Sequence, residues 1–416
     1  MSAFDADVIV AGAGMAGATF ALAAAHGGLE VAVVDPVPFD DQLAPTFDGR
    51  ASAIAYSSLR QWRVLGLGER LAPHACAIEH ILVTDGRNPG AASGPAWPVY
   101  LRFDAEEIAE RAAGEPLGWM IENRRIRQAL AATVAESPVR MIAPASVAAV
   151  ETDAAGATVR LADGRSLRAR LVVGAEGRAS KVREAAGIDV VGWGYPRSGV
   201  VATVSLERPH GGVAHELFMP GGPLAILPLT EQRASLVWTE GHDRAQALGQ
   251  ASPEAFAAHL QRRFGDYVGA VTAHGPRFVY PLSLQLAETL AAERLALLGD
   301  AGHAIHPLAG QGLNLGLKDA AALAEVLVEA RRLGEDIGAL TVLDRYVRWR
   351  RFDNTVMAMA TDGFDRLFST DAAPVRAVRD LGMAAVNRVP SARRFFMREA
   401  GGDVGELPRL LRGEAL

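Results

Sequence analysis

Three glycines near the N-terminus have a spacing that suits phosphate binding. Gly12, Gly14 and Gly17 follow a short apolar run, Val8–Ala11, and precede an alanine-rich stretch. In such a loop the first glycine permits a tight turn, the second admits a pyrophosphate to the backbone, and the third lets a helix pack on a strand. A second apolar run ends on Asp35, a carboxylate placed to accept ribose hydroxyls. The order of strand, loop, helix, strand and acid predicts a dinucleotide-binding unit.

A later segment has the residues of a second ligand-binding loop. The apolar run Leu295–Leu298 suits a buried strand that ends at Asp300, whose carboxylate can accept ribitol or ribose hydroxyls. The loop after it is punctuated by Pro307, Gly310 and Gly312. We expect an apolar helix from about Leu313, and its N-terminus would direct bare N–H groups at an anionic ring or phosphate. These features predict a flavin site.

A third segment lies between these two. An apolar strand from Leu171 runs into a Glu176-Gly177 turn, and Ser180 and Arg183 follow on a predicted helix. In order and spacing, the three segments resemble the three fingerprints of single-component flavoprotein aromatic hydroxylases. That family normally has Asp-Gly in the middle motif, so Glu176 keeps the acceptor but moves it outward by one methylene.

Within that family the chain most resembles the ubiquinone-biosynthesis (polyprenyl-phenol) hydroxylases. The matching segments cover nearly the whole chain and are residues 48–58, Glu122-Asn123 with Arg127, residues 280–282, 303–316, 361–369 and 386–390. The most discriminating part is His306-Pro307 followed by residues 309–312. The resemblance implies hydroxylation of the aromatic ring of a polyprenylated phenol in ubiquinone biosynthesis. NAD(P)H would reduce FAD, O₂ would add at the flavin C4a, and the resulting hydroperoxide would transfer one oxygen atom.

The resemblance also implies roles for particular residues. Pro307 and the backbone of 310–314 would form the wall beside the isoalloxazine, Asp300 would bind the ribitol, and Arg50 would lie at the pyrophosphate. Asn123 or Arg127 would line the inner face of the groove, and Val147 would contact the adenine. The predicted cofactor-binding residues are Gly12, Gly14, Met15, Ala16, Gly17, Asp35, Arg50, Asn123, Arg127, Val147, Glu176, Gly177, Asp300, Pro307, Gly310, Gln311, Gly312, Leu313 and Asn314.

No catalytic side chain can be assigned from the sequence. His306 and Pro307 are candidates only because they are expected beside the flavin, and no residue is an obvious general base. The histidines do not have the partners of a zinc site, so no metal is expected. His303 and His306 fit either proton transfer or ordering of the loop. Ser57-Ser58 has no triad context and suits the start of a helix.

Other functions fit the same fold. The alternatives are an FAD-dependent hydroxylase of another aromatic, a flavin-dependent halogenase, a prenyl-chain reductase and a non-catalytic flavin-bound scaffold subunit. A halogenase needs a lysine to carry the activated halogen, but Lys181 and Lys318 are the only lysines and both lie in flavin-binding segments. The hydroxylase is therefore favoured.

Composition narrows the class of protein. Of 416 residues, 50% are hydrophobic and 22% are charged, as in globular proteins. The net charge of −6 argues against nucleic acid as a partner. Cys76 is the only cysteine, which excludes an intrachain disulfide, favours a reducing compartment and suits a packing role. The uncharged stretch between Asp7 and Glu30 is broken by glycines and has no basic flank, so we interpret it as neither a signal peptide nor a membrane span.

The pattern of elements predicts an α/β fold. We expect a Rossmann-like FAD-binding domain (1–75, 105–185 and 286–330) interleaved with an antiparallel-sheet substrate domain (76–104 and 186–285). A helical C-terminal region (331–416) follows. Only one dinucleotide fingerprint is present, so NAD(P)H must bind without its own Rossmann domain.

Two features leave alternatives open. The apolar run Leu224–Leu229 suits either the core of the sheet, which we favour, or the lining of a prenyl-tail tunnel. Basic and aromatic residues cluster at 345–351 and 393–398, which fits helix packing or assembly better than contact with an anionic membrane. We therefore expect a cytoplasmic protein with at most peripheral attachment at the inner face of the membrane, a small prenylated phenol and O₂ as substrates, and assembly as a homo-oligomer or with other quinone-biosynthesis proteins.

Overall fold

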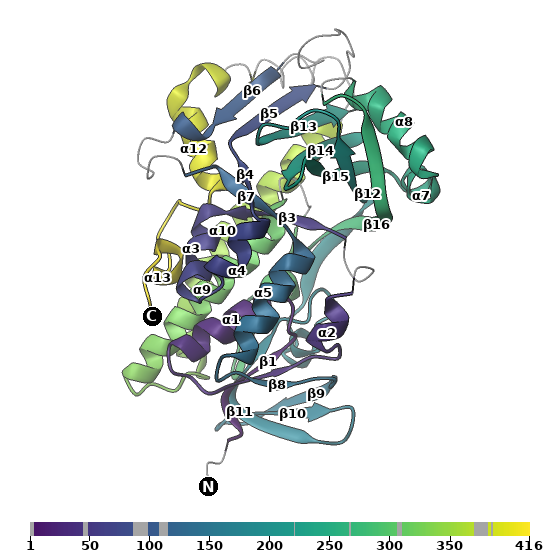
Figure 1. Cartoon of the computed structure of the whole chain (residues 1–416). Coiled ribbons are helices and arrows are strands. Elements are labelled where there is room, and N and C mark those ends of the chain that lie inside the picture. Colours follow the sequence, from purple (N-terminus) through teal and green to yellow (C-terminus); the bar gives the residue numbers. More distant parts are fainter. Residues whose placement is uncertain are drawn as a thin grey trace.

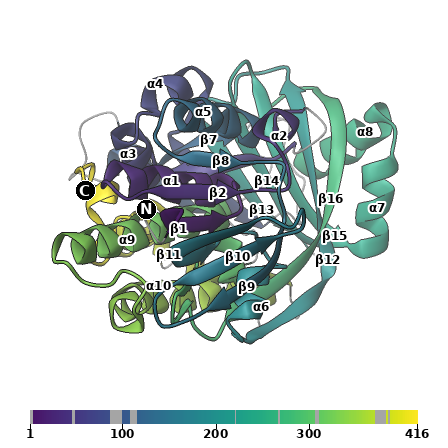
Figure 2. The same ribbon diagram turned by 90° about the horizontal axis from the view of Figure 1, so that it is seen from below.

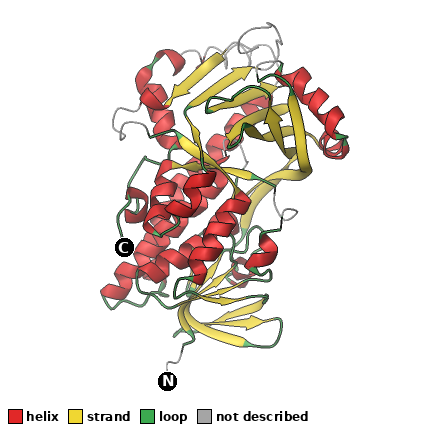
Figure 3. Cartoon of the chain, viewed as in Figure 1, coloured by secondary structure: helices red, strands yellow, loops and turns green. Residues whose placement is uncertain are grey.

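The computed structural model describes residues 4–44, 49–85, 99–107, 115–219, 221–265, 268–305, 310–369, 382–383 and 386–416. Two large sheets dominate the described chain, with helices packed beside the first sheet and over the outer face of the second (Figures 1 and 3). The predicted α/β class, with several sheets and a helical C-terminus, is confirmed.

The first sheet is built around the predicted dinucleotide unit. In spatial order, its main strands are β17 (Ala291–Ala292), β18 (Leu295–Leu297), β11 (Ser166–Gly174), β1 (Ala6–Ala11), β2 (Val31–Val34) and β8 (Arg140–Ile142). From β18 to β8 all neighbouring strands are parallel. β9 (Val147–Thr152) and β10 (Ala157–Leu161) continue the sheet from β11 as an antiparallel extension. The carboxyl ends of the parallel strands therefore meet at one edge, where ligands bind in open α/β sheets.

Alternate residues of β1 face opposite layers. Val8 and Val10 pack in a core with the helices α1 (Met15–His26), α5 (Asn123–Ala135) and α9 (Gln311–Arg332). Ile9 and Ala11 join a second core with β10 and α6 (Lys181–Ala185). Because both faces of β1 are covered, its residues from Val8 to Ala11 are all apolar.

The second sheet joins segments that are far apart in the sequence. Its strands, in spatial order, are β19 (His303–Ala304), β16 (Val271–Ala287), β12 (Val190–Leu206), β15 (Arg233–Gly241), β14 (Gly222–Leu229), β13 (Val213–Met219), β5 (His80–Asp85) and β6 (Val99–Asp104). All pairs are antiparallel except β13 with β5. Helices α7 (His242–Gln250) and α8 (Pro253–Phe264) cover its outer face (Figure 2). The inner face is turned toward the first domain.

A small third sheet lies between the two large ones, and the sequence did not reveal it. Its strands are β3 (Ala51–Ala55), β7 (Gly118–Glu122) and β4 (Cys76–Ile78). β3 contacts α9, whereas β4 and β7 contact β14. Cys76 packs among apolar residues, and burial raises the pKa of its thiol, consistent with the predicted packing role. Ser57 and Ser58 lie in the first turn of α3 (Tyr56–Val64), as expected of a helix start.

The C-terminal helices are α10 (Leu340–Ser369), α12 (Pro390–Ala400) and α13 (Arg409–Arg412). Part of the basic and aromatic cluster at 345–351 packs inward: the buried Tyr346 hydroxyl donates to the Leu297 carbonyl at 2.8 Å, and Arg350 is 2% exposed. The exposed residues of the cluster are Arg345, Arg348 and Arg351. Trp349 donates to the Glu406 carbonyl at 2.7 Å. This cluster therefore contributes to packing. Within the described ranges, no helix is long and apolar enough to cross a membrane.

Candidate active site

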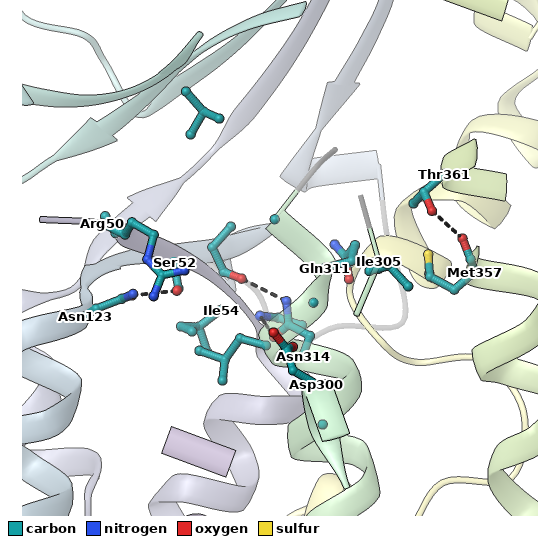
Figure 4. Close-up of a pocket in the computed structure, with 18 of the residues that line it drawn as sticks. Arg50, Ser52, Ile54, Asn123, Asp300, Ile305, Gln311, Asn314, Met357 and Thr361 are labelled. Atoms are coloured by element: carbon teal, nitrogen blue, oxygen red, sulfur yellow. Dashed lines mark hydrogen bonds between the residues drawn. The ribbon is translucent and has the colours of Figure 1, made fainter. Parts of the chain in front are cut away.

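A cavity of about 1500 Å³ runs from the glycine loop after β1 to the inner face of the second sheet. Every predicted cofactor-binding residue that the structure describes lines it except Gly17. His306 and Pro307, the two candidates beside the flavin, lie outside the described residues. Figure 4 shows Arg50, Ser52 and Ile54 on one strand beside Asn314, with Met357 and Thr361 of α10 on another side of the cavity.

The glycine loop has the geometry that its spacing predicts. Gly12 has φ +102, and a Cβ there would lie 2.5 Å from the Ala175 carbonyl oxygen. A Cβ on Gly17 would lie 2.1 Å from the Gly12 oxygen, so this residue serves close packing rather than ligand contact. A Cβ on Gly14 would have nothing within 4 Å. Gly14 is also the N-cap of α1, and no side chain of the described residues caps that helix, which leaves amide donors directed at the cavity.

Asp35 organises this loop from the tip of β2. Its carboxylate accepts from the Ala13 N–H at 2.6 Å and from the Val37 N–H at 2.8 Å. Burial raises the pKa of Asp35, and these two backbone bonds oppose the shift. The sequence missed Gln42, which donates to the Val37 carbonyl at 2.9 Å and also lines the cavity. The predicted contact of Asp35 with ribose remains a proposal.

Glu176 uses its extra methylene to fold back on its own segment. Its carboxylate accepts from the Ser180 hydroxyl and, at 3.2 Å, from the Lys181 N–H at the start of α6. Burial raises the pKa of Glu176, and the bond from Ser180 opposes this shift. The neighbouring Arg178, which sequence reasoning did not select, donates to the Ser283 hydroxyl of β16 at 2.7 Å. Arg178 therefore ties the dinucleotide domain to the second sheet along the cavity.

The third loop and the start of α9 complete the dinucleotide side. Asp300 is about half exposed and lies 3.8 Å from Arg178. Gly310, with φ 64, is the N-cap of α9, so the helix begins at Gln311 rather than near Leu313. Asn314 is buried; it donates to the Ala53 carbonyl at 2.8 Å and accepts from the Ala55 N–H at 3.0 Å. These bonds fix α9 to β3.

Two further predicted residues lie at the inner face of the groove. Asn123 accepts from the Ser52 hydroxyl at 2.6 Å, and Arg127 is buried one helical turn further along α5. The Arg50 guanidinium lies over the Tyr280 ring, 5.1 Å from its centroid. Val147 lines the cavity at the first residue of β9. The cavity thus brings together predicted residues that lie far apart in the sequence.

A buried ionic network supports the third loop from behind. Asp319 of α9 accepts from the Gly299 N–H at 3.0 Å, from Arg350 Nε at 2.9 Å and from His303 Nε2. Burial favours the neutral acid, but the charges of His303 and Arg350 outweigh it and hold the pKa of Asp319 well below its usual range. His303 is 2% exposed and is not among the cavity residues, which supports its loop-ordering alternative. No local sequence pattern signals this network, because its members come from separate elements of the fold.

Strand β14 has one face in the core of the sheet and one face on the cavity. Leu224 and Ile226 pack in the core beneath α7 and α8, whereas Ala225 and Leu227 line the cavity. The preference for sheet core over tunnel lining was therefore correct only for alternate residues, because successive side chains of a strand point to opposite faces.

These residues fit FAD. Two uncapped helix N-termini, at Gly14 and Gly310, face one cavity, and Gly14 leaves room beside the backbone for a pyrophosphate. Among the described residues no group of three or more His, Cys, Asp or Glu side chains is placed to hold a metal ion. The first domain together with this cavity defines a flavin-binding oxidoreductase.

Comparison with known proteins identifies the family to which this chain belongs. Residues 5–358 match the family model described as FAD binding domain. The chain is 45% identical to a ubiquinone hydroxylase, UbiL, of Rhodospirillum rubrum, over 99% of this chain and 94% of that protein. It is 34% identical to the 3-demethoxyubiquinol 3-hydroxylase of Escherichia coli, over 95% of this chain and 98% of that protein. The chain belongs to the FAD-binding family that contains these ubiquinone-biosynthesis hydroxylases, and it is an FAD-dependent monooxygenase.

Solved structures show how widely the fold is used. The p-nitrophenol 4-monooxygenase PnpA of Pseudomonas putida superposes with a TM-score of 0.78 at 19% identity, covering 96% of this chain and 99% of PnpA. PqsL of Pseudomonas aeruginosa, in complex with 2-aminobenzoylacetate, superposes with a TM-score of 0.74 at 25% identity, covering 91% of this chain and 99% of PqsL. At such identities the substrate must be argued from this chain's own cavity.

Proposed function

We propose that this protein hydroxylates the aromatic ring of a polyprenylated phenol in ubiquinone biosynthesis, with NAD(P)H as the reductant and O₂ as the oxygen donor. The observation that supports this most directly is the single cavity that extends from the dinucleotide loops to an apolar sheet and the C-terminal helices. Its size and apolar far end suit a ring with a long hydrocarbon tail better than a small polar aromatic.

The dinucleotide side of the cavity would hold the cofactor. The amides at the start of α1 would bind the pyrophosphate, and Asp300 and the start of α9 would hold the ribitol and the ring system. Arg50, held over Tyr280, would place a positive charge at the pyrophosphate region. When bound, FAD supplies electron transfer from NAD(P)H and activation of O₂. The protein orients the ring against the flavin and excludes water.

The tail would lie along the apolar residues of the second sheet and of α10. Ile81 and Val83 of β5, Leu227 of β14, and Val356 and Met357 of α10 all line the cavity. Such walls bind by burial of apolar area, which is tolerant of chain length. These apolar walls would bind a prenylated phenol more tightly than a phenol without a tail, because the tail buries more apolar area.

We further propose that the mouth of this cavity contacts a membrane surface, where a prenylated substrate would reside. Phe352, Val356 and Met359 form one exposed stripe of α10, and Val356 also lines the cavity. Phe395 and Phe396 of α12 are likewise exposed and line the cavity. We call these five residues the rim. The exposed Arg351 and Arg394 lie next to rim residues in the sequence and would favour anionic lipid, although a protein partner covering the rim is the competing outcome.

The function is tested with the purified, FAD-loaded protein. Oxygen and NAD(P)H consumption are measured with and without a short-chain prenylphenol, and products are weighed by mass spectrometry. We expect faster NAD(P)H oxidation with the phenol and a product that gains one oxygen atom from ¹⁸O₂. If NAD(P)H oxidation yields only hydrogen peroxide with every prenylphenol but a hydroxylated product with another aromatic compound, the substrate is that other class of aromatic. If neither NADH nor NADPH reduces the bound flavin, the non-catalytic scaffold subunit is favoured instead.

A further inference from the structure

The inner face of the second sheet contains one carboxyl group among apolar side chains. Side chains of β13 alternate: Leu217 and Met219 pack in the core beneath α7 and α8, whereas Ala214, Glu216 and Phe218 lie on the cavity side. Glu216 thus projects into the cavity from the middle of β13. Glu216 is half-buried, and it is one of the residues that line the cavity.

The residues beside Glu216 are apolar across the sheet. Glu216 pairs with Val83 on one side and Ala225 on the other. The same register continues outward through further cavity residues. The full row is Leu101, Val83, Glu216, Ala225, Val237 and Val201. Cross-strand neighbours on one face lie close together, so this row surrounds the carboxyl with hydrocarbon.

The Glu216 side chain has no hydrogen bond or ion pair with any other described residue. The adjacent His215 packs its ring against Phe264 on the opposite face, and burial lowers the pKa of His215 to about 4, so it is neutral near pH 7. On α10 the cavity residues Val356, Met357, Ala360 and Thr361 carry no charge. Apart from Glu216, the charged cavity residues among those described all come from the dinucleotide side and are Asp35, Arg50, Arg127, Glu176, Arg178, Lys181 and Asp300.

An unpartnered carboxyl in an apolar wall is unfavourable unless a ligand supplies its partner. Burial raises the pKa of Glu216 to about 7. Near neutral pH the group therefore exchanges readily between acid and carboxylate, which is the property of an efficient proton acceptor. An aromatic ring with a hydroxyl group suits this part of the cavity. Its ring would pack against the apolar row, and its hydroxyl would donate a hydrogen bond to the carboxylate.

We propose that Glu216 binds the ring hydroxyl of the aromatic substrate and accepts its proton. This inference rests on the proposed function and deepens it. In the step, the phenolic O–H bond breaks, a bond forms between that proton and a Glu216 carboxylate oxygen, and the negative charge moves to the phenolic oxygen. No further reactant is needed. The charge enriches the ring carbons ortho and para to the oxygen, which are the carbons that an electrophilic oxygen donor attacks.

The proposal is tested first by binding, without turnover. Equilibrium dialysis of the FAD-loaded protein gives dissociation constants for 2-geranylphenol and its methyl ether, which cannot donate the hydrogen bond. For wild type we expect the phenol to bind about 30-fold more tightly than the ether, from one charge-assisted hydrogen bond. The ratio should fall to about fivefold in Glu216→Gln, a neutral acceptor, and to about one in Glu216→Leu.

A pH series separates proton acceptance from simple packing. Between pH 6 and 8 the wild-type affinity for the phenol should rise several-fold, because the carboxylate is the form that accepts the bond, and Glu216→Gln should show a flat profile. In turnover, Glu216→Gln should lower kcat for the phenol by about 100-fold while NAD(P)H oxidation continues and releases peroxide. Glu216→Asp should restore part of kcat. The matched control is Glu231→Gln, the same change at an exposed site in the turn after β14.

The outcomes separate this assignment from the proposed function. If wild type hydroxylates the phenol but Glu216→Gln keeps the wild-type binding ratio and pH profile, Glu216 is not the acceptor and the function stands. If wild type binds neither compound and oxidises neither, the proposed function fails and the assignment fails with it. The assignment is supported if Glu216→Gln loses both the preference for the phenol over the ether and the pH dependence of phenol affinity, while the control variant keeps both.

Discussion

The cavity has two walls that bind by different physics. The dinucleotide wall consists of glycine loops and two helix N-termini, with seven charged side chains among its described residues. Its groups are held by directional bonds, such as those of Asp35 to the loop and Asn314 to β3. The sheet wall presents mainly hydrocarbon and one carboxyl, Glu216. The first wall is suited to one cofactor in one pose, and the second to a family of tails.

This difference explains how one fold serves many aromatic hydroxylases. A directional wall must keep its residues, because each lost bond leaves a buried polar group without a partner. An apolar wall can change its residues with little penalty so long as volume is conserved. Specificity within the sheet wall then depends on a few polar groups, and Glu216 is the one that we assign here.

The largest effect should come from the network behind the dinucleotide wall. Asp319→Asn leaves the charge of Arg350 buried without its counter-ion and weakens the acceptor of His303, so we expect a loss of about 3–5 kcal/mol in unfolding free energy. Chemical denaturation measures it. Asp353→Asn removes a bond to the same arginine at a half-exposed site and should lose about 1 kcal/mol or less. Equal losses in the two variants would mean that the network does not brace this wall.

The glycine loop offers a sharper contrast within the same wall. Gly17→Ala places a Cβ against the Gly12 carbonyl, and we expect it to destabilise the apo-protein by about 3 kcal/mol. Gly14→Ala meets no atom within 4 Å, so thermal unfolding of the apo-protein should be almost unchanged. Its methyl group would instead occupy the space of the pyrophosphate, and FAD affinity should fall about 10- to 100-fold. Fluorescence titration with FAD checks this. Wild-type FAD affinity in Gly14→Ala would place the pyrophosphate elsewhere.

The elements of the dinucleotide wall were predictable because their signals are local. The predicted order of strand, helix and second strand before Asp35 agrees with β1, α1 and β2. Turn geometry and helix starts depend on neighbouring residues, which the sequence displays directly. Glu176 shows the limit of such signals: its position predicts an acceptor at the cavity, but nothing local predicts the hydrogen bond that it accepts from Ser180.

The sheet wall was predictable only in outline. The parallel pairing of β5 with β13 joins residues about 130 positions apart, as in Ile81 with Ala214, and no local pattern encodes it. Strands β12 and β16 are each 17 residues long, but glycines and prolines interrupt both sequences, so their full lengths are not evident from local patterns. Glu216 looked like an ordinary polar residue of a strand. Its significance appears only when the register places it among apolar cavity residues.

The pH dependence of stability tests whether Glu216 is buried as the sheet wall implies. Its folded pKa, about 7, lies above the ordinary value of 4.5, so the folded state holds the proton more tightly. Its contribution to stability is therefore fully present below pH 4.5 and is lost as the pH rises to about 7. Relative to wild type, Glu216→Gln should gain stability across that window, by at most about 3 kcal/mol and by less if water enters the cavity. Thermal unfolding at pH 5 and pH 8, with Glu231→Gln as control, measures the difference. A constant difference would mean that the carboxyl is solvated.

The smallest expected effect concerns the rim, where the sheet wall's apolar character continues to the outer surface. Phe352 is 74% exposed, so Phe352→Ser should leave folding intact. It should weaken binding to anionic phospholipid vesicles about fivefold, since partial burial of one phenyl ring in a membrane interface is worth roughly 1 kcal/mol. Leu333→Ser is the matched control: Leu333 is 72% exposed but follows the far end of α9, away from the cavity. Flotation with vesicles compares the two. If both variants bind like wild type, the rim does not contact lipid, and the apolar stripe is better explained as the contact surface of a protein partner.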